Sequence, residues 1–433
     1  MYKVSRYNII ENIEDGFLIY NTFSGCFLFV DNNRKNKIVD FLKNPESNID
    51  FETLNNFLEA GFIIRKNFDE IAELKKIYLN SKKNKDSLSI VVLASESCNF
   101  NCPYCFIKEK RGFNMKSFVY KSILNLIKKD IKRLRNLKIQ IFGGEPLLNH
   151  RSNILFLKRL NNMIKNYNIN KEFVIITNGY ALNLKVFKEY LNEGCNNFQI
   201  TLDGYPEIHN SLRYTQTDKN TFKRIWNNIN EIKKLDKNFK MTLRVNFPKL
   251  DKNKMKEFIN FLSKNFYKDE RFQLYFRQIV DYRKDIKNFN ICSKEDGIKN
   301  QFEYSLVYYK KAGIDKNKIA EYFMPKPISK WCDAASDNHY IIGADGLIFK
   351  CDVEIGSEEF SCGQLKDNGE VEIYSKTYHQ KYSPYNRKKC KNCILLPICQ
   401  GGCAYSYKNT GKCFYTEDFI RKIMRDFHYN FNN

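Results

Sequence analysis

The sequence predicts an α/β protein with a partial (β/α)6 barrel, preceded by a small module and followed by a cysteine-rich segment. Three observations predict it. Strand and helix patterns alternate regularly between residues 89 and 276, the first 85 residues read as a separate mixture of short elements, and the 14 cysteines gather mainly in two groups. A chain of 433 residues with 43% apolar residues is long enough for two or three folded domains.

The first 85 residues predict a winged-helix-like module. Apolar runs within 16–30 flank Ser24-Gly25 and indicate a β-hairpin. Residues 33–42 and 51–60 have helical spacing, a strand follows Gly61, and 69–79 again reads as a helix. The polar, charged stretch 81–86 predicts a linker to the next domain.

The next segment alternates strands and helices in a way that favours parallel strands with right-handed crossovers, hence a barrel or a doubly wound sheet. Strands are expected at 89–94, 137–142, 173–176, 198–202, 241–245 and 272–276, and helices at 119–134, 152–167, 184–191, 221–234 and 252–265. Each polar motif directly follows a strand, which is where the sites of TIM-like barrels are assembled. Six units instead of eight would leave the barrel open on one side, as suits a bulky substrate. The expected division is 1–85 module, 86–290 barrel, 291–325 helical linker and 326–433 cysteine-rich domain.

The composition and net charge of the chain limit the classes of partner that it is expected to bind. The net charge of +23 raises nucleic acid as a partner, but lysines are spread over nearly every predicted helix, and no basic stripe interleaved with aromatics stands out. We therefore expect no nucleic-acid partner. The basic surface suits an acidic peptide or an electron donor such as a ferredoxin or flavodoxin. Neither a signal peptide nor a stretch of roughly 18 apolar residues is found, so we expect a cytoplasmic protein without a membrane partner and with reduced thiols.

The first cysteine group is Cys98-x3-Cys102-x2-Cys105, placed directly after a predicted strand. Reduced thiolates at this density favour an iron–sulfur cluster or zinc over disulfides. Buried structural thiols, or three of four zinc ligands, remain alternatives for this group taken alone. Three ligands on a four-iron cluster leave one iron free to bind a group that is not protein.

These three cysteines, the sequence Gly143-Gly144-Glu145-Pro146 after the second strand and the six βα units resemble the radical S-adenosylmethionine (radical SAM) superfamily over roughly residues 88–280. The resemblance implies a [4Fe–4S] cluster on the three cysteines, with the amino and carboxylate groups of S-adenosylmethionine on its fourth iron. Two glycines permit close backbone approach, and a carboxylate suits the ammonium group. The resemblance implies cofactor contacts at Tyr104 near the adenine, at Gly143, Gly144 and Glu145 for the amino group, at Thr201, and at Arg213 for the carboxylate. Asn178 and Asn246 also follow strands and are expected to line the cavity.

The second group contains seven cysteines between Cys332 and Cys413. Zinc is the alternative for paired Cys-x2-Cys elements in isolation. The complete pattern looks like a SPASM domain, the auxiliary-cluster extension of peptide-modifying radical SAM enzymes. That resemblance implies a distal auxiliary cluster on Cys390, Cys393, Cys399 and Cys413, and a proximal one on Cys332, Cys351 and Cys403, for three clusters in all. Either Cys362 supplies a fourth proximal ligand, or that position stays open to a substrate thiolate. A hairpin turn at Asp345-Gly346 is expected to bring Cys332 and Cys351 within reach of one another.

The N-terminal module resembles the peptide-recognition domain of many maturases of ribosomally made peptides, which would bind a leader peptide as an added strand. A packing or dimerisation module is the alternative. The whole pattern indicates an oxidoreductase that abstracts hydrogen from a precursor peptide with a 5′-deoxyadenosyl radical, forming a thioether or another crosslink. The second hypothesis is an anaerobic sulfatase-maturating enzyme that makes formylglycine, and a remote third is a zinc-stabilised scaffold. Nothing in the sequence selects a general base.

Overall fold

The computed structural model describes residues 2–47, 49–107, 109–249, 252–282 and 290–431. The chain forms two compact units. Unit 1 comprises Met1–Asn84, Asp315–Asp337 and Tyr378–Asn433, and unit 2 comprises Lys85–Ile314 and Asn338–Thr377. Each unit is therefore built from segments that are distant in the sequence, and the four-part division expected above stays a prediction.

Unit 2 contains the six parallel strands that the sequence predicts, which confirms the α/β fold. They lie in chain order, from the first strand in the interior of the sheet to the sixth at one edge. They are β6 (Ser87–Ser95), β7 (Asn136–Gly143), β8 (Asn170–Thr177), β9 (Asn197–Thr201), β10 (Lys240–Phe247) and β11 (Phe272–Gln278). Side chains alternate between the two faces of each strand. In β7, Leu137, Ile139 and Ile141 are at most 1% exposed, whereas Gln140 and Phe142 on the other face line a cavity.

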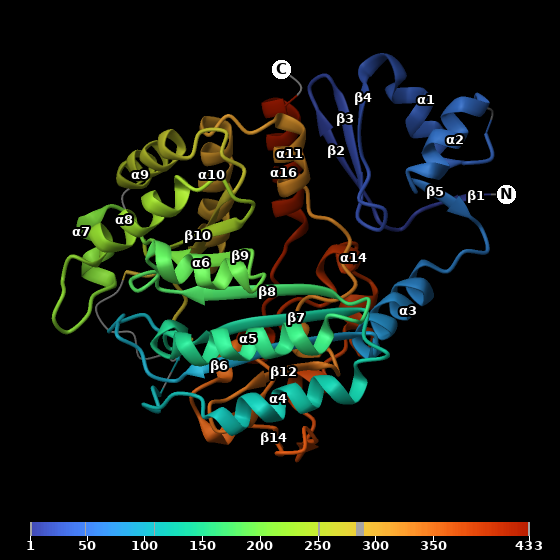
Figure 1. The fold of residues 1–433 in the computed structure, drawn as a ribbon. Helices are drawn as coiled ribbons and strands as arrows, with labels where there is room; N and C mark the ends of the chain where they lie inside the picture. The colour runs from blue at the N-terminus through green and yellow to red at the C-terminus, as the bar shows by residue number, and fades with distance from the viewer. Residues whose placement is uncertain (1, 48, 108, 250–251, 283–289, 432–433) are drawn as a thin grey trace. The chain divides into compact units, whose positions relative to one another are not determined.

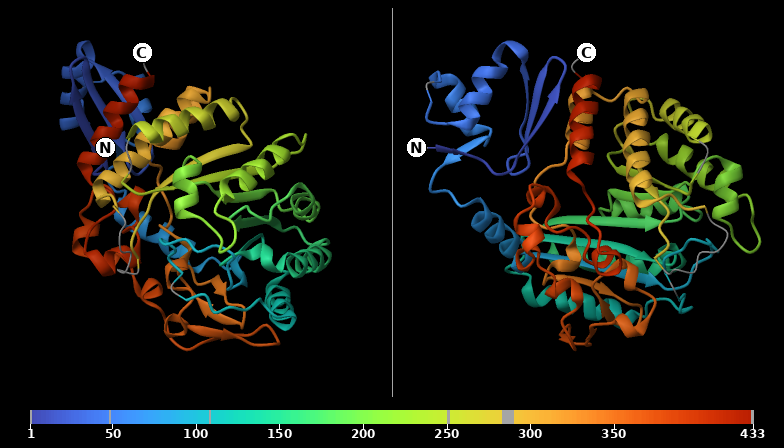
Figure 2. Two further views of the ribbon diagram at one scale, coloured as in Figure 1. Left: turned by 90° about the vertical axis from the view of Figure 1, so that its left-hand side faces the viewer. Right: turned by 180° about the vertical axis from the view of Figure 1, so that it is seen from behind.

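The crossover helices cover one face of this sheet (Figures 1 and 2). They are α4 (Ser117–Asp130), α5 (His150–Ile164), α6 (Leu184–Asn192), α8 (Thr221–Lys233) and α9 (Lys252–Asn265). The short α7 (Pro206–Leu212) and the 3-10 segment η1 (Pro146–Asn149) lie in loops after strands, and α10 (Lys294–Lys311) follows the sheet. All five crossovers lie where helical spacing of apolar residues predicts them, because each helix buries one apolar stripe against the sheet.

The sheet continues beyond β6 with strands from the second half of the chain. β12 (His339–Ile342) pairs in parallel with β6, and β13 (Leu347–Phe349), β14 (Gly363–Leu365) and β15 (Val371–Ile373) follow antiparallel. The predicted hairpin at Asp345-Gly346 is confirmed as the β12–β13 pair. Its attachment to β6 was not predicted. It covers backbone groups that would otherwise form an unpaired sheet edge.

The N-terminal part of unit 1 contains two small sheets. β2 (Asn8–Ile13), β3 (Gly16–Asn21) and β4 (Phe27–Asp31) form an antiparallel sheet in that order, and β1 (Tyr2–Val4) pairs with β5 (Ile63–Arg65). The predicted hairpin is therefore present as β3–β4. Helices α1 (Asn32–Lys43), α2 (Phe51–Glu59) and α3 (Glu70–Lys83) begin after Asp31, Asp50 and Asp69, whose carboxylates accept hydrogen bonds from the first free backbone N–H groups. The expected linker was wrong for residues 81–83, which continue α3.

The rest of unit 1 consists of short helices and two longer ones. These are α11 (Lys316–Phe323), α12 (Tyr378–Lys381), α13 (Lys388–Lys391), α14 (Leu396–Cys399), α15 (Ala404–Thr410) and α16 (Glu417–Phe431). A shared core joins α3 to the cysteine-rich segment, where Leu74 and Tyr78 pack with Tyr385, Cys390 and Leu396. Unit 1 also contains the 3-10 segments η2 (Asp333–Ala335) and η5 (Pro384–Asn386), whereas η3 (Asp352–Glu354) and η4 (Glu358–Phe360) belong to unit 2. In the described part of the chain, no helix has the length and apolar character needed to cross a bilayer.

Candidate active site

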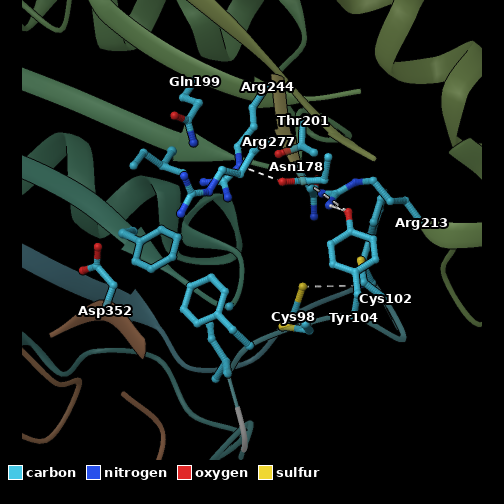
Figure 3. Close-up of a pocket in the computed structure, with 18 of the residues that line it drawn as sticks. Cys98, Cys102, Tyr104, Asn178, Gln199, Thr201, Arg213, Arg244, Arg277 and Asp352 are labelled. Atoms are coloured by element: carbon cyan, nitrogen blue, oxygen red, sulfur yellow. Dashed lines mark hydrogen bonds between the residues drawn. The ribbon is translucent and has the colours of Figure 1, made fainter. Parts of the chain in front are cut away.

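A cavity of about 200 Å³ lies at the carboxyl ends of the parallel strands in unit 2 (Figure 3). Its walls come from the loop after β6 and from the ends of β7 to β11. Because all these strands run in the same direction, side chains that are far apart in the sequence meet at one edge of the sheet. Ten of the sequence-predicted residues line it or sit beside it: Cys98, Cys102, Tyr104, Cys105, Gly143, Gly144, Asn178, Thr201, Arg213 and Asn246.

The loop after β6 brings the first three cysteines to the floor of the cavity. Burial raises the pKa of the Cys98 thiol to about 12, and the Glu145 charge adds to this effect. Burial also raises the pKa of Cys102, which the thiolate of Cys105 raises further. Buried thiols of this kind form thiolates only when a cation compensates their charge, which fits an iron cluster as the group that they hold.

Gly143 and Gly144 allow the end of β7 to approach the backbone of the cysteine loop. A Cβ on Gly143 would lie 2.1 Å from the Ser95 carbonyl oxygen, and one on Gly144 would lie 2.3 Å from the Ser97 carbonyl oxygen. The Gly144 N–H donates to the Ser95 carbonyl (2.8 Å), and the Glu145 N–H donates to the Ser97 carbonyl (2.9 Å). The two glycines thus fasten the cysteine loop to the second strand.

The Glu145 carboxylate is buried beneath the cavity and joins three loops. It accepts hydrogen bonds from the Leu147 N–H (3.0 Å), the Thr177 hydroxyl (2.6 Å) and the Asn178 N–H (2.8 Å). Burial raises the pKa of Glu145, and these three hydrogen bonds oppose the rise. The carboxylate is 1% exposed and lies outside the set of described residues that line the cavity, so its contact with a bound amino group stays a prediction.

Tyr104 lies at the centre of a buried polar network. Its hydroxyl donates to the Asp203 carboxylate and accepts from Arg213 Nη1 (2.8 Å). Asn246 Nδ2 is 3.4 Å from the same hydroxyl, and the Asn246 N–H donates to Asp203 Oδ1 (2.8 Å). Burial raises the pKa of Asp203, while the Arg213 charge lowers it. The network fixes the tyrosine ring and the arginine, which the sequence placed only as separate cofactor contacts.

His209, on α7, supports this network from below. Its Nδ1 accepts a hydrogen bond from the Asp203 N–H (3.2 Å), so the ring proton is on Nε2. Burial and, secondly, the Arg213 charge hold the pKa of His209 well below its usual range. The histidine therefore stays neutral around neutral pH.

The wall across the cavity from the cysteines is basic, which the sequence analysis missed. Arg244 and Arg277 project from β10 and β11 near Gln199, and Asp352 lies apart from them (Figure 3). Arg244 Nε donates to Asn246 Oδ1 (2.8 Å). The signal was present as the alternation of polar residues along β10, but strand polarity alone does not show which face lines a cavity.

A second missed feature is the anchor of the cysteine loop at Arg111. Its guanidinium forms a bidentate ion pair with Glu96, on one side at 2.6 Å, and a hydrogen bond of 2.7 Å to Asp345 in the β12–β13 turn. The Glu96 carboxylate also accepts from the Ala344 N–H (2.8 Å). The added hairpin therefore stabilises the loop that carries the three cysteines.

Unit 1 gathers four further cysteines. In each of the six pairs formed by Cys390, Cys393, Cys399 and Cys413, the charge of one thiolate raises the pKa of the other. Burial is the larger cause, and it raises the pKa of Cys399 to about 12. Four thiols close enough to affect one another in this way suit an iron–sulfur cluster bound by four cysteines.

The other cysteines are less complete as sites. Cys332 and Cys403 are close enough in unit 1 for the Cys403 charge to raise the pKa of Cys332, after burial. Cys351 and Cys362 belong to unit 2, whereas Cys332 and Cys403 belong to unit 1. The ligand set of the proximal cluster therefore stays a prediction, as does the expected closeness of Cys332 and Cys351. Cys26, Cys195 and Cys292 belong to neither predicted group.

The comparisons with known proteins agree with this geometry. Residues 92–262 match the sequence model of the Radical SAM superfamily. The chain is 28% identical to a cysteine-type anaerobic sulfatase-maturating enzyme of Clostridium novyi, over 73% of this chain and 88% of that protein. It is 25% identical to the radical SAM cyclopropyl synthase TigE of Paramaledivibacter caminithermalis, over 97% of this chain and 95% of that protein.

A solved structure shares the fold along nearly the whole chain. Streptococcus suis SuiB bound to its precursor peptide SuiA superposes with a TM-score of 0.53 at 15% identity, covering 98% of this chain and 100% of that one. The matched domain contains the three cysteines and most residues of the cavity. The cofactors are therefore an iron–sulfur cluster and S-adenosylmethionine. The chain therefore contains a domain of the Radical SAM superfamily at residues 92–262.

Proposed function

We propose that this enzyme modifies a ribosomally made precursor peptide by removing hydrogen from an unreactive carbon, with a thioether crosslink as the first expected product. The observation that carries the proposal is the extent of the similarity. The match to the sulfatase-maturating enzyme covers 73% of this chain, whereas those to the cyclopropyl synthase and to peptide-bound SuiB cover 97% and 98%. Matches of this length must include most of the N-terminal module.

In this proposal, Cys98, Cys102 and Cys105 hold the cluster that binds S-adenosylmethionine. Tyr104, Gly143, Gly144, Glu145, Thr201 and Arg213 surround that cofactor. When bound and reduced, the cluster and S-adenosylmethionine supply a 5′-deoxyadenosyl radical. The chain's own contribution is positioning: Asp203 holds the Tyr104 hydroxyl, and the Tyr104 hydroxyl in turn orients Arg213.

In the three-stranded sheet of the module at residues 1–84, β4 forms an edge to which a leader peptide can add. At the opposite edge, Arg421 of α16 occupies part of β2: it donates to the Ile10 carbonyl and pairs with Glu11. Within the described residues, β4 pairs with β3 alone. A peptide in extended conformation could therefore add beside β4, with backbone hydrogen bonds supplying affinity.

The cavity also suits an anionic group. Arg244 and Arg277 line the wall away from the cysteines, and Asp352 is the one acidic residue among the described lining residues. Arginine binds carboxylates through two parallel hydrogen bonds. The carboxylate belongs either to the peptide or to the cofactor, and loss of affinity for one of them in an Arg277→Gln variant assigns it.

The chemistry of the peptide balances without oxygen. Thioether formation breaks one C–H bond and one S–H bond and forms one C–S bond. The peptide gives up a hydrogen atom to the deoxyadenosyl group, a proton to solvent and one electron to an oxidised acceptor. The product is lighter by two hydrogens, and each crosslink consumes one S-adenosylmethionine if the cofactor is not regenerated.

Co-expression with short peptides encoded beside the gene, followed by mass spectrometry, tests the proposal. We expect a loss of two hydrogens per crosslink, abolished by Cys98→Ala and by deletion of residues 1–84. An electron donor of the flavodoxin or ferredoxin type should support the reaction in purified form. An unmodified peptide beside an enzyme that is loaded with iron and cleaves S-adenosylmethionine would contradict it.

Maturation of a sulfatase is the second candidate, favoured by the 28% identity to the Clostridium novyi enzyme. In that reaction a cysteine side chain becomes an aldehyde and loses its sulfur. A sulfatase-derived peptide incubated with the enzyme distinguishes the two functions. An aldehyde trapped by a hydrazide reagent supports the second, whereas an unchanged peptide excludes it.

A further inference from the structure

Arg387 lies beside the four-cysteine site of unit 1 and is held in one position. It immediately precedes α13, which carries Cys390. Its Nη1 donates to the Tyr382 hydroxyl (2.5 Å), and its guanidinium carbon lies 3.5 Å from the centre of the Tyr407 ring. The Tyr382 hydroxyl in turn donates to the Gly401 carbonyl (2.5 Å). A planar guanidinium stacked on one ring and bonded to another loses little further freedom when it forms another hydrogen bond.

The second terminal nitrogen of this guanidinium has no acceptor. Arg387 Nη2 is buried, and within the described residues it donates to no protein group. A buried charged donor without an acceptor destabilises the folded chain. A group that sits in this position and accepts hydrogen bonds would remove that cost.

Hydrogen bonds and close contacts place Arg387 beside the cysteine site. The Arg387 carbonyl accepts a hydrogen bond from the Cys390 N–H (3.1 Å). Gly401, to which the Tyr382 hydroxyl donates, lies two residues after Cys399, and the next N–H, that of Gly402, donates to the Cys399 carbonyl (2.7 Å). A Cβ on Gly402 would lie 3.6 Å from the Cys399 Sγ and 3.7 Å from the Cβ of Phe414, the residue after Cys413. The guanidinium, its tyrosine clamp and the cysteines therefore form one local site.

We propose that Arg387 is a positioning residue that donates its free N–H to a sulfur of the iron–sulfur cluster held by Cys390, Cys393, Cys399 and Cys413, and thereby raises the reduction potential of that cluster. Reduction adds one electron and one negative charge to a site that already has four thiolates. A fixed positive charge and an N–H···S hydrogen bond stabilise the reduced form more than the oxidised form. The cluster becomes a better acceptor for the electron that the peptide releases.

This inference rests on the assignment of the distal cluster, not on the identity of the peptide. The two fail differently: a wrong cluster assignment appears as unchanged iron content in Cys399→Ala, whereas a wrong role for Arg387 appears as an unchanged potential in a fully loaded protein. The test uses the full chain with Cys98, Cys102 and Cys105 replaced by alanine, so that the auxiliary clusters give the signal. Midpoint potentials are measured by electron paramagnetic resonance during redox titration.

In Arg387→Gln we expect one auxiliary potential to become more negative, with the iron content unchanged. The matched control is Arg34→Gln, which removes the same charge from an exposed position on α1, where the side chain is 79% exposed. The control potentials should equal those of the parent protein. In Arg387→Lys the shift should be smaller, because the charge stays and the fixed planar donor is lost.

Equal potentials in Arg387→Gln and the parent would overturn the proposal, as would equal shifts of both auxiliary potentials. If Arg387→Gln loses the cluster, Arg387→Lys decides the question. An Arg387→Lys protein with full iron and the parent potential contradicts donation by the guanidinium, and a potential shifted to more negative values supports it.

Discussion

Substitution of Gly144 by alanine tests the close approach of β7 to the cysteine loop. Gly144 does not need a left-handed backbone, so alanine strains no φ angle, and any effect is steric. The new Cβ would lie 2.3 Å from the Ser97 carbonyl oxygen and 3.1 Å from the Cys98 Cβ. The two backbones must separate by about 0.7 Å to reach a tolerated contact, and overpacking of this kind costs about 1–3 kcal/mol. The same movement weakens two backbone hydrogen bonds, worth about 0.5–1.5 kcal/mol each, which brings the total to about 2–6 kcal/mol.

A loss of this size at the cysteine loop should reduce loading of the first cluster. We expect Gly144→Ala to contain about four fewer irons per chain after anaerobic reconstitution, and to cleave little S-adenosylmethionine. Gly112→Ala is the matched control, because it lies in the same loop region and its Cβ would meet nothing within 4 Å. In this control, alanine is strained by the positive φ of 83°, but the contact between β7 and the cysteine loop is unchanged, so the iron content should remain full. Full iron and normal cleavage in Gly144→Ala would refute the reasoning.

Three other predictions follow from the two sites. Tyr104→Phe removes the hydroxyl shared by two buried charged groups and should lower the free energy of unfolding by about 1–3 kcal/mol. It should also weaken S-adenosylmethionine binding in calorimetry, and the exposed Tyr167→Phe should do neither. Burial holds the pKa of His209 well below 6.5 in the folded chain. Below about pH 6.5 the unfolded chain therefore binds a proton that the folded chain does not. As the pH is lowered, the free energy of unfolding decreases by up to about 1.4 kcal/mol per pH unit. Urea unfolding between pH 5 and 6.5 should show a shallower loss in His209→Gln, and parallel curves would argue against this assignment. Cys399→Ala should lose about four irons per chain while still cleaving S-adenosylmethionine. Unchanged iron would show that the four cysteines hold no cluster.

The alternation of apolar runs and helical spacing was enough to predict the six parallel strands and the helices between them. These patterns are local, since each strand and helix must bury its own apolar face. The spacing Cys98-x3-Cys102-x2-Cys105 is equally local, and it places three sulfurs in one loop whatever surrounds them. The position of Thr201 and Asn246 at strand ends followed from the same pattern, because parallel strands share one carboxyl edge.

Contacts between distant segments needed the structure. The strand β12 joins β6 across about 250 residues, and no local pattern marks this pairing. Arg111 bridges Glu96 and Asp345 for the same reason: an ion pair depends on two backbones meeting, which sequence polarity does not show.

The sequence alone therefore determined the order of the elements, the ligand-type residues and the edge of the sheet at which they gather, because each of these depends on short-range periodicity and spacing. Only the tertiary structure decided that Glu145 lies beneath the cavity, that Asp203 clamps Tyr104, and that Arg387 keeps one buried N–H without a protein acceptor. Burial, charge proximity and hydrogen-bond geometry arise from packing between remote segments, and packing is a property of the folded chain.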